Sequence, residues 1–336
     1  MKLNFRSGSA YASQKAKAYI ESINPEDVNN IMIIRHAAIG DLFAMRPFLV
    51  EARKFFPNAK ITLNILRTYS YGVPYDLIDD LLIIENKDKK LTLWERIKEA
   101  RKIPAQDIVF DFTDSALTNI LTLFTKSKLK IGYPYRIHRR LFYNMTVHRS
   151  DFVLETESMI HMLNFLGAKH SVPFFDYGFN MQKSIQDKPY IIYFAGASTK
   201  DKCWEEDKFS GLIIEMAMQY TNYHHVILEG IKDDEKFENI YNTTKHMPNV
   251  VKQKAMPLNE TMDYLNNASI VVCNDTGIRN MAIAVNTPTV GIFNVTGPYR
   301  YWPRNGIHEI VFNPNFTSPS INDARNCCEK ILKRTI

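Results

Sequence analysis

The segment Asn274-Asp275-Thr276-Gly277 has the composition of a turn that binds phosphate. It follows a predicted strand and precedes a predicted helix, so backbone N–H groups and the positive end of the helix dipole would face a bound anion. The Thr276 hydroxyl adds a hydrogen-bond donor, and Asp275 could accept hydrogen bonds from ribose hydroxyls. These residues suit a nucleoside diphosphate, although capping of the helix would also explain them.

Two further segments could contribute to the same kind of site. Ala195-Gly196-Ala197-Ser198 is followed by Lys200 and Lys202, and together they offer backbone donors and a mobile cation to a phosphate. Glu229-Gly230 ends another predicted strand and could face a nucleoside. Surface positions for the lysines and an ordinary turn after Glu229 are the alternatives.

Another junction between a strand and a helix lies near the start of the chain, at Arg35-His36-Ala37-Ala38-Ile39-Gly40-Asp41. Its small residues let the backbone come close to a ligand, and Gly40 permits a tight turn. Asp41 stands at the start of the following helix, where aspartate is also a common cap. The junction therefore predicts either a ligand site or a capped helix.

Positive charge is concentrated between Asp114 and Asp151, where the sequence has no acidic residue, in a chain of net charge +6. The basic residues of this segment are Lys126, Lys128, Lys130, Arg136, Arg139, Arg140 and Arg149. Such a segment suits an anionic partner, which could be a phosphorylated glycolipid, a membrane surface or a nucleic acid. A solvated basic face is the simpler alternative.

Sequence signatures of several other enzyme classes are absent. There is no glycine-rich dinucleotide fingerprint after Ile34, no Walker A loop and no His-Glu-x-x-His helix. The cysteines lack the paired spacing of a zinc site. We therefore disfavour dehydrogenases, P-loop kinases and zinc proteases, and we expect neither a metal site nor a cofactor.

Short β-branched runs alternate with amphipathic, helix-length segments, and this alternation must position the segments described above. Predicted strands cover residues 31–34, 61–66, 81–84, 108–111, 190–194, 225–228, 270–273 and 289–293. Predicted helices cover residues 42–56, 92–102, 115–125, 153–167, 207–220, 233–246, 258–267 and 321–333, and a further helix ends near residue 285. The pattern predicts an α/β fold with parallel sheets covered by helices on both faces.

At 336 residues the chain exceeds the usual size of one domain. The periodicity lapses between residues 170 and 189, as in an interdomain linker. We predict a Rossmann-like domain at 1–170, with an added helix over 11–23, a linker at 171–189 and a second Rossmann-like domain at 190–336. The last helix could pack back on the first domain.

No apolar run is long enough for a signal peptide or a membrane-spanning helix. We therefore expect a cytoplasmic protein that is at most peripheral on the inner membrane.

In order and spacing, these segments resemble the heptosyltransferase-type glycosyltransferases of family 9 over about residues 31–305. The matching pieces are Ile31 to Asp41, Arg46-Pro47, Phe56 to Leu63, Gly196-Ala197-Ser198, Lys202-Cys203-Trp204, Asn274 to Gly277 and Asn286 to Phe293. The resemblance implies a GT-B fold of two facing Rossmann-like domains, the first binding the acceptor and the second the nucleotide sugar.

The resemblance also implies an inverting transfer of a heptose, or a related sugar, onto a phosphorylated lipopolysaccharide core acceptor, with ADP-heptose as the expected donor. Asp41 occupies the place of the general base. We expect donor binding at Gly196, Ser198, Lys202, Glu229, Asp275, Thr276 and Gly277. We expect acceptor binding at Gly40, Arg136, Arg139 and Arg140. The basic stretch would bind acceptor phosphates or the anionic inner-membrane surface, and no nucleic acid.

The chain departs from the family pattern at several places. Asn280 stands where members commonly have histidine, Glu205 follows Trp204 where proline is usual, and extra residues precede the first strand. Three alternatives therefore stay open: a GT-B transferase for a different sugar, a sugar-nucleotide epimerase, and a degenerate, non-catalytic protein that binds a nucleotide sugar.

Overall fold

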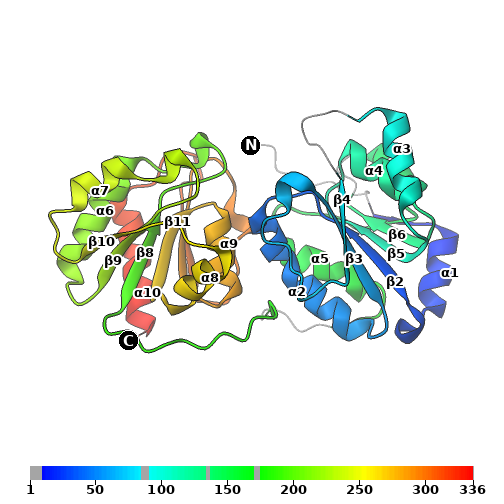
Figure 1. Ribbon diagram of the computed structural model, residues 1–336, viewed down its shortest axis with the longest axis horizontal. Helices are drawn as coiled ribbons and strands as arrows, with labels where there is room; N and C mark the ends of the chain where they lie inside the picture. Colours follow the sequence, from blue (N-terminus) through cyan, green and yellow to red (C-terminus); the bar gives the residue numbers. More distant parts are fainter. Residues whose placement is uncertain (1–9, 85–90, 134–136, 170–174, 336) are drawn as a thin grey trace. The chain divides into compact units, whose positions relative to one another are not determined.

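The computed structural model describes residues 10–84, 91–133, 137–169 and 175–335 (Figure 1). Contacts within the chain divide it into two units, of which the first ends at Gly178 and the second begins at Phe179. Each unit contains one largely parallel sheet with helices packed on it. The predicted α/β class is therefore confirmed.

The first unit is built on a seven-stranded sheet in the order β1-β7-β6-β5-β2-β3-β4. Its strands are β1 (Tyr11–Ala12), β2 (Asn30–Ile34), β3 (Lys60–Leu66), β4 (Asp80–Ile84), β5 (Gln106–Asp111), β6 (Ser127–Gly132) and β7 (Met145–Thr146). All neighbours pair in parallel except β1, which runs antiparallel to β7. Because the chain leaves β2 on one side and returns at β5 on the other, the topological switch point lies between these two strands.

Helices cover both faces of this sheet. They are α1 (Gln14–Ser22), α2 (Ile39–Phe55), α3 (Leu93–Lys102), α4 (Ala116–Phe124) and α5 (Glu155–Asn164). Along β2, Ile31 and Ile33 belong to the core with α2 and α5, whereas Met32 and Ile34 belong to the core with α3 and α4. A strand buried on both faces is typical of the middle of a parallel sheet.

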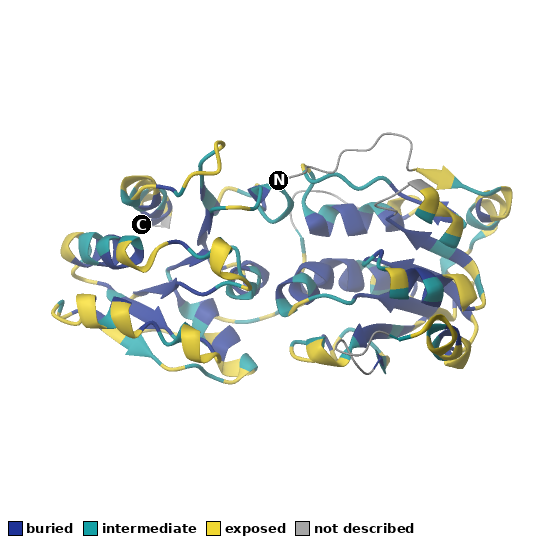
Figure 2. Ribbon diagram, turned by 90° about the horizontal axis from the view of Figure 1, so that it is seen from above, coloured by how far each residue is buried: buried dark blue, intermediate teal, exposed yellow. Residues whose placement is uncertain are grey.

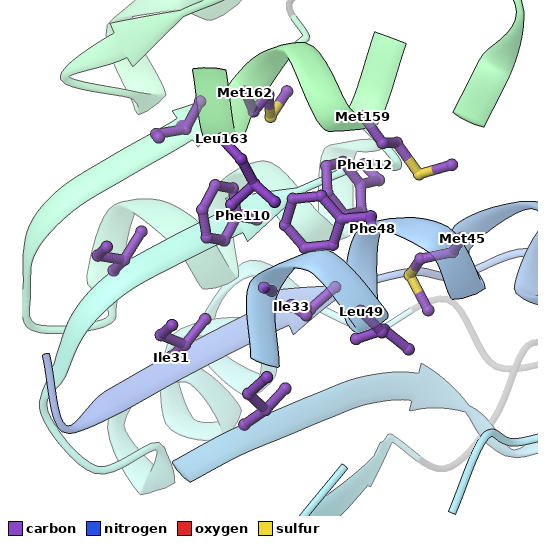
Figure 3. Packing of buried hydrophobic residues seen from close by; sticks show 14 of the residues in the cluster. Ile31, Ile33, Met45, Phe48, Leu49, Phe110, Phe112, Met159, Met162 and Leu163 are labelled. Carbon is purple, nitrogen blue, oxygen red and sulfur yellow. The ribbon is translucent and has the colours of Figure 1, made fainter. Parts of the chain in front are cut away.

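Figure 3 shows the core between α2, α5 and the sheet. The ring of Phe48 on α2 packs edge-on against Phe110 and Phe112, with centroid distances of 5.0 and 4.8 Å. Met159 and Leu163 of α5 complete the cluster, and all five side chains are buried. This packing fixes where α2 and α5 begin relative to the ends of β2 and β5.

The second unit is built on a six-stranded parallel sheet in the order β10-β9-β8-β11-β12-β13. Its strands are β8 (Tyr190–Phe194), β9 (His224–Leu228), β10 (Val250–Gln253), β11 (Ile270–Asn274), β12 (Thr289–Phe293) and β13 (His308–Phe312). This is the strand order of a Rossmann fold, and its switch point lies between β8 and β11.

The helices of the second unit are α6 (Glu206–Gln219), α7 (Glu238–Thr244), α8 (Leu258–Asn267), α9 (Gly277–Ala284) and α10 (Ile321–Thr335). α6 packs against α7 and α10, and α8 packs against α9. Figure 2 shows that the strands of both units are mostly buried, whereas the outer faces of the helices are exposed. Within the described ranges, no helix is both long and apolar enough to span a membrane.

The predicted helix over 233–246 is wrong in its first half. A short 3-10 turn, Asp233–Glu235, comes first, and α7 begins only at Glu238. Between them Phe237 adopts a left-handed conformation with φ of 52°. That backbone turns the ring of Phe237 into the core, where it meets Phe194 edge-on with a centroid distance of 5.6 Å.

The two ends of the first unit also differ from the predicted pattern. The helix predicted over 11–23 starts at Gln14, because Tyr11–Ala12 form the edge strand β1. Of the predicted linker, residues 171–174 lie outside the described residues. The next residues pack on the first unit, since Arg46 Nε donates to the carbonyl of Tyr177 at 2.7 Å.

Candidate functional site

In the second unit, the loops after β8 and β11 meet at the switch point. β8 leads into Ala195 and Gly196, and β11 leads into Asp275 and α9. Asn274, the last residue of β11, joins the two loops: its Nδ2 donates to the carbonyl of Ala195 at 2.6 Å, and its Oδ1 accepts from the amide of Trp204 at 3.0 Å. Open α/β sheets bind their ligands at this position.

Lys202 and Asp275, which are far apart in the sequence, form an ion pair here. The distance from Lys202 Nζ to Asp275 Oδ2 is 2.8 Å. The Thr296 hydroxyl donates to the same carboxylate oxygen at 3.0 Å. The Lys202 side chain is 25% exposed and that of Asp275 is 12% exposed, so Lys202 is the more exposed member of the pair.

The other predicted donor-side residues of these two loops lie around the ion pair. Gly277 is the first residue of α9, and Thr276 is its N-cap residue. Gly196 is buried, and a Cβ atom there would lie 2.9 Å from the ring of Phe194. Ser198 is exposed in the same loop. The structure therefore gathers these residues at one edge of the sheet.

Glu229 lies at the same edge, but one strand further out. It follows β9, which pairs with β8. Its carboxylate is held by two lysines, at 3.0 Å from Lys252 Nζ and 3.6 Å from Lys236 Nζ. Within the described structure, Glu229 is therefore engaged in ion pairs separate from that of Lys202.

In the first unit, Arg35 joins the two sides of the switch point. It follows β2, and its Nη1 donates to the carbonyl of Phe112, just beyond β5, at 2.7 Å. Its Nη2 lies 2.9 Å from Asp41 Oδ1. Asp41 follows Gly40 in the first turn of α2. The Arg35 side chain is 4% exposed and that of Asp41 is 26% exposed, so the carboxylate is the accessible member of the pair.

A second carboxylate, that of Glu155, shares the same guanidinium group. Glu155 is the first residue of α5, and its Oε1 lies 3.1 Å from Arg35 Nη2. Arg149 Nη2 lies 2.5 Å from both carboxylate oxygens of Glu155. The Glu155 side chain is 1% exposed; this burial raises the pKa of its carboxyl group, and the charge of Arg35 opposes the rise.

His36, the next residue after Arg35, is held in its neutral form. Its Nε2 lies 2.8 Å from Asn64 Oδ1, and its backbone amide donates to the Thr113 hydroxyl at 2.8 Å. Burial lowers the pKa of His36 to about 4. At neutral pH this imidazole therefore adds no charge beside Arg35 and Asp41.

A cluster of buried polar side chains lies at the end of β5 and just after it. Asp111 Oδ1 accepts from the amides of Thr113 and Asp114 at 2.8 and 3.2 Å. The Tyr143 hydroxyl lies 2.8 Å from the other carboxylate oxygen of Asp111. Arg139 Nη1 lies 3.2 Å from Asp114 Oδ2. Burial nevertheless raises the pKa of Asp114 to about 6, against the opposing charge of Arg139.

The predicted acceptor-side arginines have different surroundings. Arg139 and Arg140 lie on the 3-10 helix η3 (Ile137–Phe142). Arg139 points to the end of β5, where it contacts Asp114, whereas the guanidinium group of Arg140 lies over the ring of Tyr11, 5.7 Å from its centroid. Arg136 lies outside the described residues.

The rest of the basic segment does not form one solvated face. β6 runs through it, and Lys128 of this strand pairs with Asp107 at 2.7 Å. Lys130 Nζ donates to the carbonyl of Leu123 at 2.7 Å, and Arg149 is largely buried against Glu155. The structure therefore distributes these charges among several partners.

Sequence reasoning assigned no role to Arg35, Glu155 or Thr296. A signal was present for Arg35, because it directly follows a buried parallel strand and so belongs to the edge where ligands bind. Glu155 gave no such signal, since its partner Arg35 is distant in the sequence. In the described parts of the chain, no three His, Cys, Asp or Glu side chains are arranged to hold a metal ion.

The chain is similar to known glycosyltransferases. The model of glycosyltransferase family 9 (heptosyltransferase) matches residues 96–330. Lipopolysaccharide heptosyltransferase 1 of Campylobacter coli is 23% identical over 304 residues, which cover 84% of this chain and 88% of that protein. Lipopolysaccharide heptosyltransferase 3 of Escherichia coli is 23% identical over 295 residues, covering 80% and 85%.

Among solved structures, E. coli heptosyltransferase WaaC with ADP-2-deoxy-2-fluoro heptose matches with a TM-score of 0.72. The alignment covers 91% of this chain and all of that chain, at 17% sequence identity. This likeness confirms the predicted GT-B type of fold.

Proposed function

The chain belongs to glycosyltransferase family 9, the heptosyltransferase family, and from this premise we propose that it transfers a heptose from ADP-heptose to a phosphorylated lipopolysaccharide core acceptor. The transfer inverts the configuration at the sugar. It takes place at the cytoplasmic face of the inner membrane, where the protein is soluble or peripheral.

The observation that supports donor binding in the second unit is the ion pair between Lys202 and Asp275, just before α9. Departure of the nucleoside diphosphate develops negative charge on its phosphate oxygens, and fixed cations and helix N-termini stabilise such charge. The Lys202 side chain is partly exposed and flexible by its chemistry, so it can exchange Asp275 for a phosphate while Thr296 keeps its hydrogen bond to Asp275. The backbone amides near Thr276 and Gly277 complete this arrangement, and Gly196 allows the donor to approach.

Deprotonation of the acceptor hydroxyl group depends on Asp41. An attacking hydroxyl group must lose its proton to a base, and that base must be ionised and accessible. The Asp41 carboxylate meets both requirements, since the guanidinium group of Arg35 stabilises its charge and its side chain is partly exposed. Arg139, Arg140 and Arg136 then bind acceptor phosphates, for which arginine is well suited.

A transfer assay with the purified protein tests this function. The probes are ADP-heptose, other nucleotide sugars, and a lipopolysaccharide core acceptor truncated before its heptoses, with the acceptor mass measured before and after incubation. We expect one heptose to be added from ADP-heptose and release of ADP that depends on the acceptor.

The same assay distinguishes the alternatives. Transfer from a different nucleotide sugar would identify a transferase for another sugar. Conversion of the nucleotide sugar without an acceptor would indicate an epimerase, and binding without any turnover would indicate a non-catalytic protein. Each of these results would refute the proposal.

A further inference from the structure

Arg35 pairs with Asp41 and also with Glu155, a carboxylate that takes no part in the proposed transfer chemistry. We propose that Glu155 is a positioning residue: it holds the Arg35 guanidinium group in place and thereby orients the Asp41 carboxylate toward the acceptor. This inference rests on the proposed role of Asp41 as general base.

Arg35 is the link between the two carboxylates. Its Nη2 lies 2.9 Å from Asp41 and 3.1 Å from Glu155, and its Nη1 donates to the carbonyl of Phe112 at 2.7 Å. Three acceptors from three elements therefore fix one planar group. Loss of Glu155 would remove one of the two carboxylates that Nη2 contacts, so we expect the guanidinium group to shift and to carry Asp41 with it.

Glu155 is itself firmly placed. It occupies the first turn of α5, where the helix dipole favours an anion, and α5 packs against α2. The hydroxyl of the adjacent Thr156 donates to the carbonyl of Ala44 in α2 at 2.8 Å. Arg149 supports Glu155 from the other side, with its guanidinium group 5.4 Å from the ring centroid of Tyr133. The start of α5 is thus tied to the helix that carries Asp41.

Among the described residues, the ion pairs of the network join two arginines to two carboxylates. Arg35 after β2 and Arg149 before α5 face Asp41 of α2 and Glu155 of α5. His36 is neutral, and the carboxylates after β5 are engaged with Tyr143 and Arg139. Removal of the Glu155 charge would leave Asp41 beside an excess of positive charge, which makes a carboxylate a weaker base.

Glu155→Gln removes this charge at nearly constant volume. We expect turnover to fall about 10- to 100-fold, as for other displacements of a reacting group, with little change in the KM for the donor. We also expect the acidic limb of the pH–rate profile to move to lower pH. In the Asp41→Asn background, Glu155→Gln should add no further loss of turnover, because it acts through Asp41. Unchanged kinetics in the folded single variant, or an additive loss in the double variant, would overturn the proposal.

Glu157→Gln is the matched control. Glu157 lies in the same first turn of α5, but its side chain is 33% exposed and its Oε1 lies 3.9 Å from His161 Nε2. This substitution removes the same charge from the same helix end, so we expect kinetics like those of the wild type. An equal defect in both variants would assign the effect to the helix end and overturn the proposal.

Loss of Glu155 also removes the carboxylate that two buried guanidinium groups, those of Arg35 and Arg149, share, which disfavours folding. If Glu155→Gln alone does not fold, Glu155→Gln with Arg149→Met removes the second buried cation. Arg35 still lacks its contact with Glu155 there, so the loss of turnover should persist. Turnover like that of the wild type in this folded double variant would overturn the proposal.

A measurement without turnover separates this inference from the proposed function. The Asp41 carboxyl group can be titrated by carbon-13 NMR in the wild type and in both glutamine variants. We expect its midpoint to fall in Glu155→Gln and to stay constant in Glu157→Gln. An unchanged midpoint in both would refute the role of Glu155, whereas a wild type without transferase activity would refute the proposed function alone.

Discussion

Asp41 and Lys202 occupy similar positions in the two units of the chain. Each follows a parallel strand that borders a switch point, and each forms an ion pair: Asp41 pairs with Arg35 of the same junction, whereas Lys202 pairs with Asp275 of another loop. Their chemical roles nevertheless differ. A carboxylate can take a proton from an acceptor, whereas an ammonium group can only stabilise the charge of a leaving diphosphate. The two residues should therefore be separable by experiment.

Asp41→Asn should lower turnover by about two to four orders of magnitude, the usual range for a positioned base, and leave donor affinity unchanged. Lys202→Ala should instead raise the dissociation constant of ADP-heptose, because a phosphate loses its cation. Steady-state kinetics and calorimetric titration measure the two effects.

Each variant serves as the control for the other. Unchanged turnover in Asp41→Asn would leave Asp41 only its ion pair with Arg35 in the first turn of α2, whose N-cap residue is Ala38. Unchanged donor affinity in Lys202→Ala would remove Lys202 from the donor site.

At the scale of elements, the 3-10 helix η3 presents two adjacent arginines to different parts of the first unit. Arg139 neutralises Asp114, whose side chain is fully buried, while Arg140 stacks on Tyr11 of β1. Removal of one partner from a buried ion pair costs stability, whereas an exposed cation–π contact contributes little.

Arg140→Ser should therefore raise the KM for the acceptor without a change in the free energy of unfolding, because only a phosphate-binding cation is lost. Arg139→Ser should do the same and also lower the free energy of unfolding, by about 1 to 3 kcal/mol, since the buried Asp114 loses its ion pair with Arg139. Acceptor kinetics and urea unfolding separate the two effects.

Lys102→Ser is the control, because Lys102 carries the same charge at an exposed position on α3 and pairs only locally with Glu99. Equal acceptor KM values for Arg140→Ser and Lys102→Ser would contradict an acceptor-binding role for η3.

Strands that are apolar along their whole length could be predicted from the sequence, as β8, β11 and β12 were. β6 was missed because Lys128 and Lys130 interrupt its apolar pattern, although their ammonium groups reach Asp107 and the carbonyl of Leu123. The break before α7 could not be predicted either, because the left-handed Phe237 is favoured only by its tertiary contact with Phe194.

The same distinction applies to the candidate site. Asp41, Asp275 and Gly196 lie in segments that connect a strand to the next helix or in the first turn of that helix, so local sequence was sufficient to select them. Glu155 and Thr296 come to the site through the packing of elements distant in the sequence, and nothing in their own neighbourhood indicates a partner.

At the scale of the whole molecule, buried titratable groups make stability depend on pH in opposite directions. Burial lowers the pKa of His36 and His225 to about 4 and that of His308 to about 3. Burial raises that of Asp114 to about 6. A neutral buried histidine stabilises the fold fully above about pH 6.5, its unfolded pKa, and loses this contribution as pH falls toward 4. Asp114 behaves in the reverse sense, since its contribution is full below about pH 4 and is lost as pH rises through about 6.

Acidification from pH 7 to pH 5 should therefore affect two variants oppositely. The free energy of unfolding of His225→Gln should fall by about 1 to 2 kcal/mol less than that of the wild type, because this variant has no imidazole at residue 225 that the unfolded chain can protonate. The free energy of unfolding of Asp114→Asn should fall by about 1 kcal/mol more than that of the wild type, because this variant lacks the carboxyl group that takes up a proton in the folded state. Urea unfolding at both pH values tests this, and equal pH dependence in all three proteins would contradict it.

The antiparallel pairing of β1 with β7 also sets an order of events during synthesis. Tyr11 and Ala12 leave the ribosome early, but their partners Thr146 and Met145 are made much later, and β6, on which α1 packs, is also translated late. Since domains assemble as units while the chain emerges, Tyr11 and Ala12 must wait without these partners until most of the first unit has been translated. The edge of the sheet that carries β7 therefore forms late in synthesis.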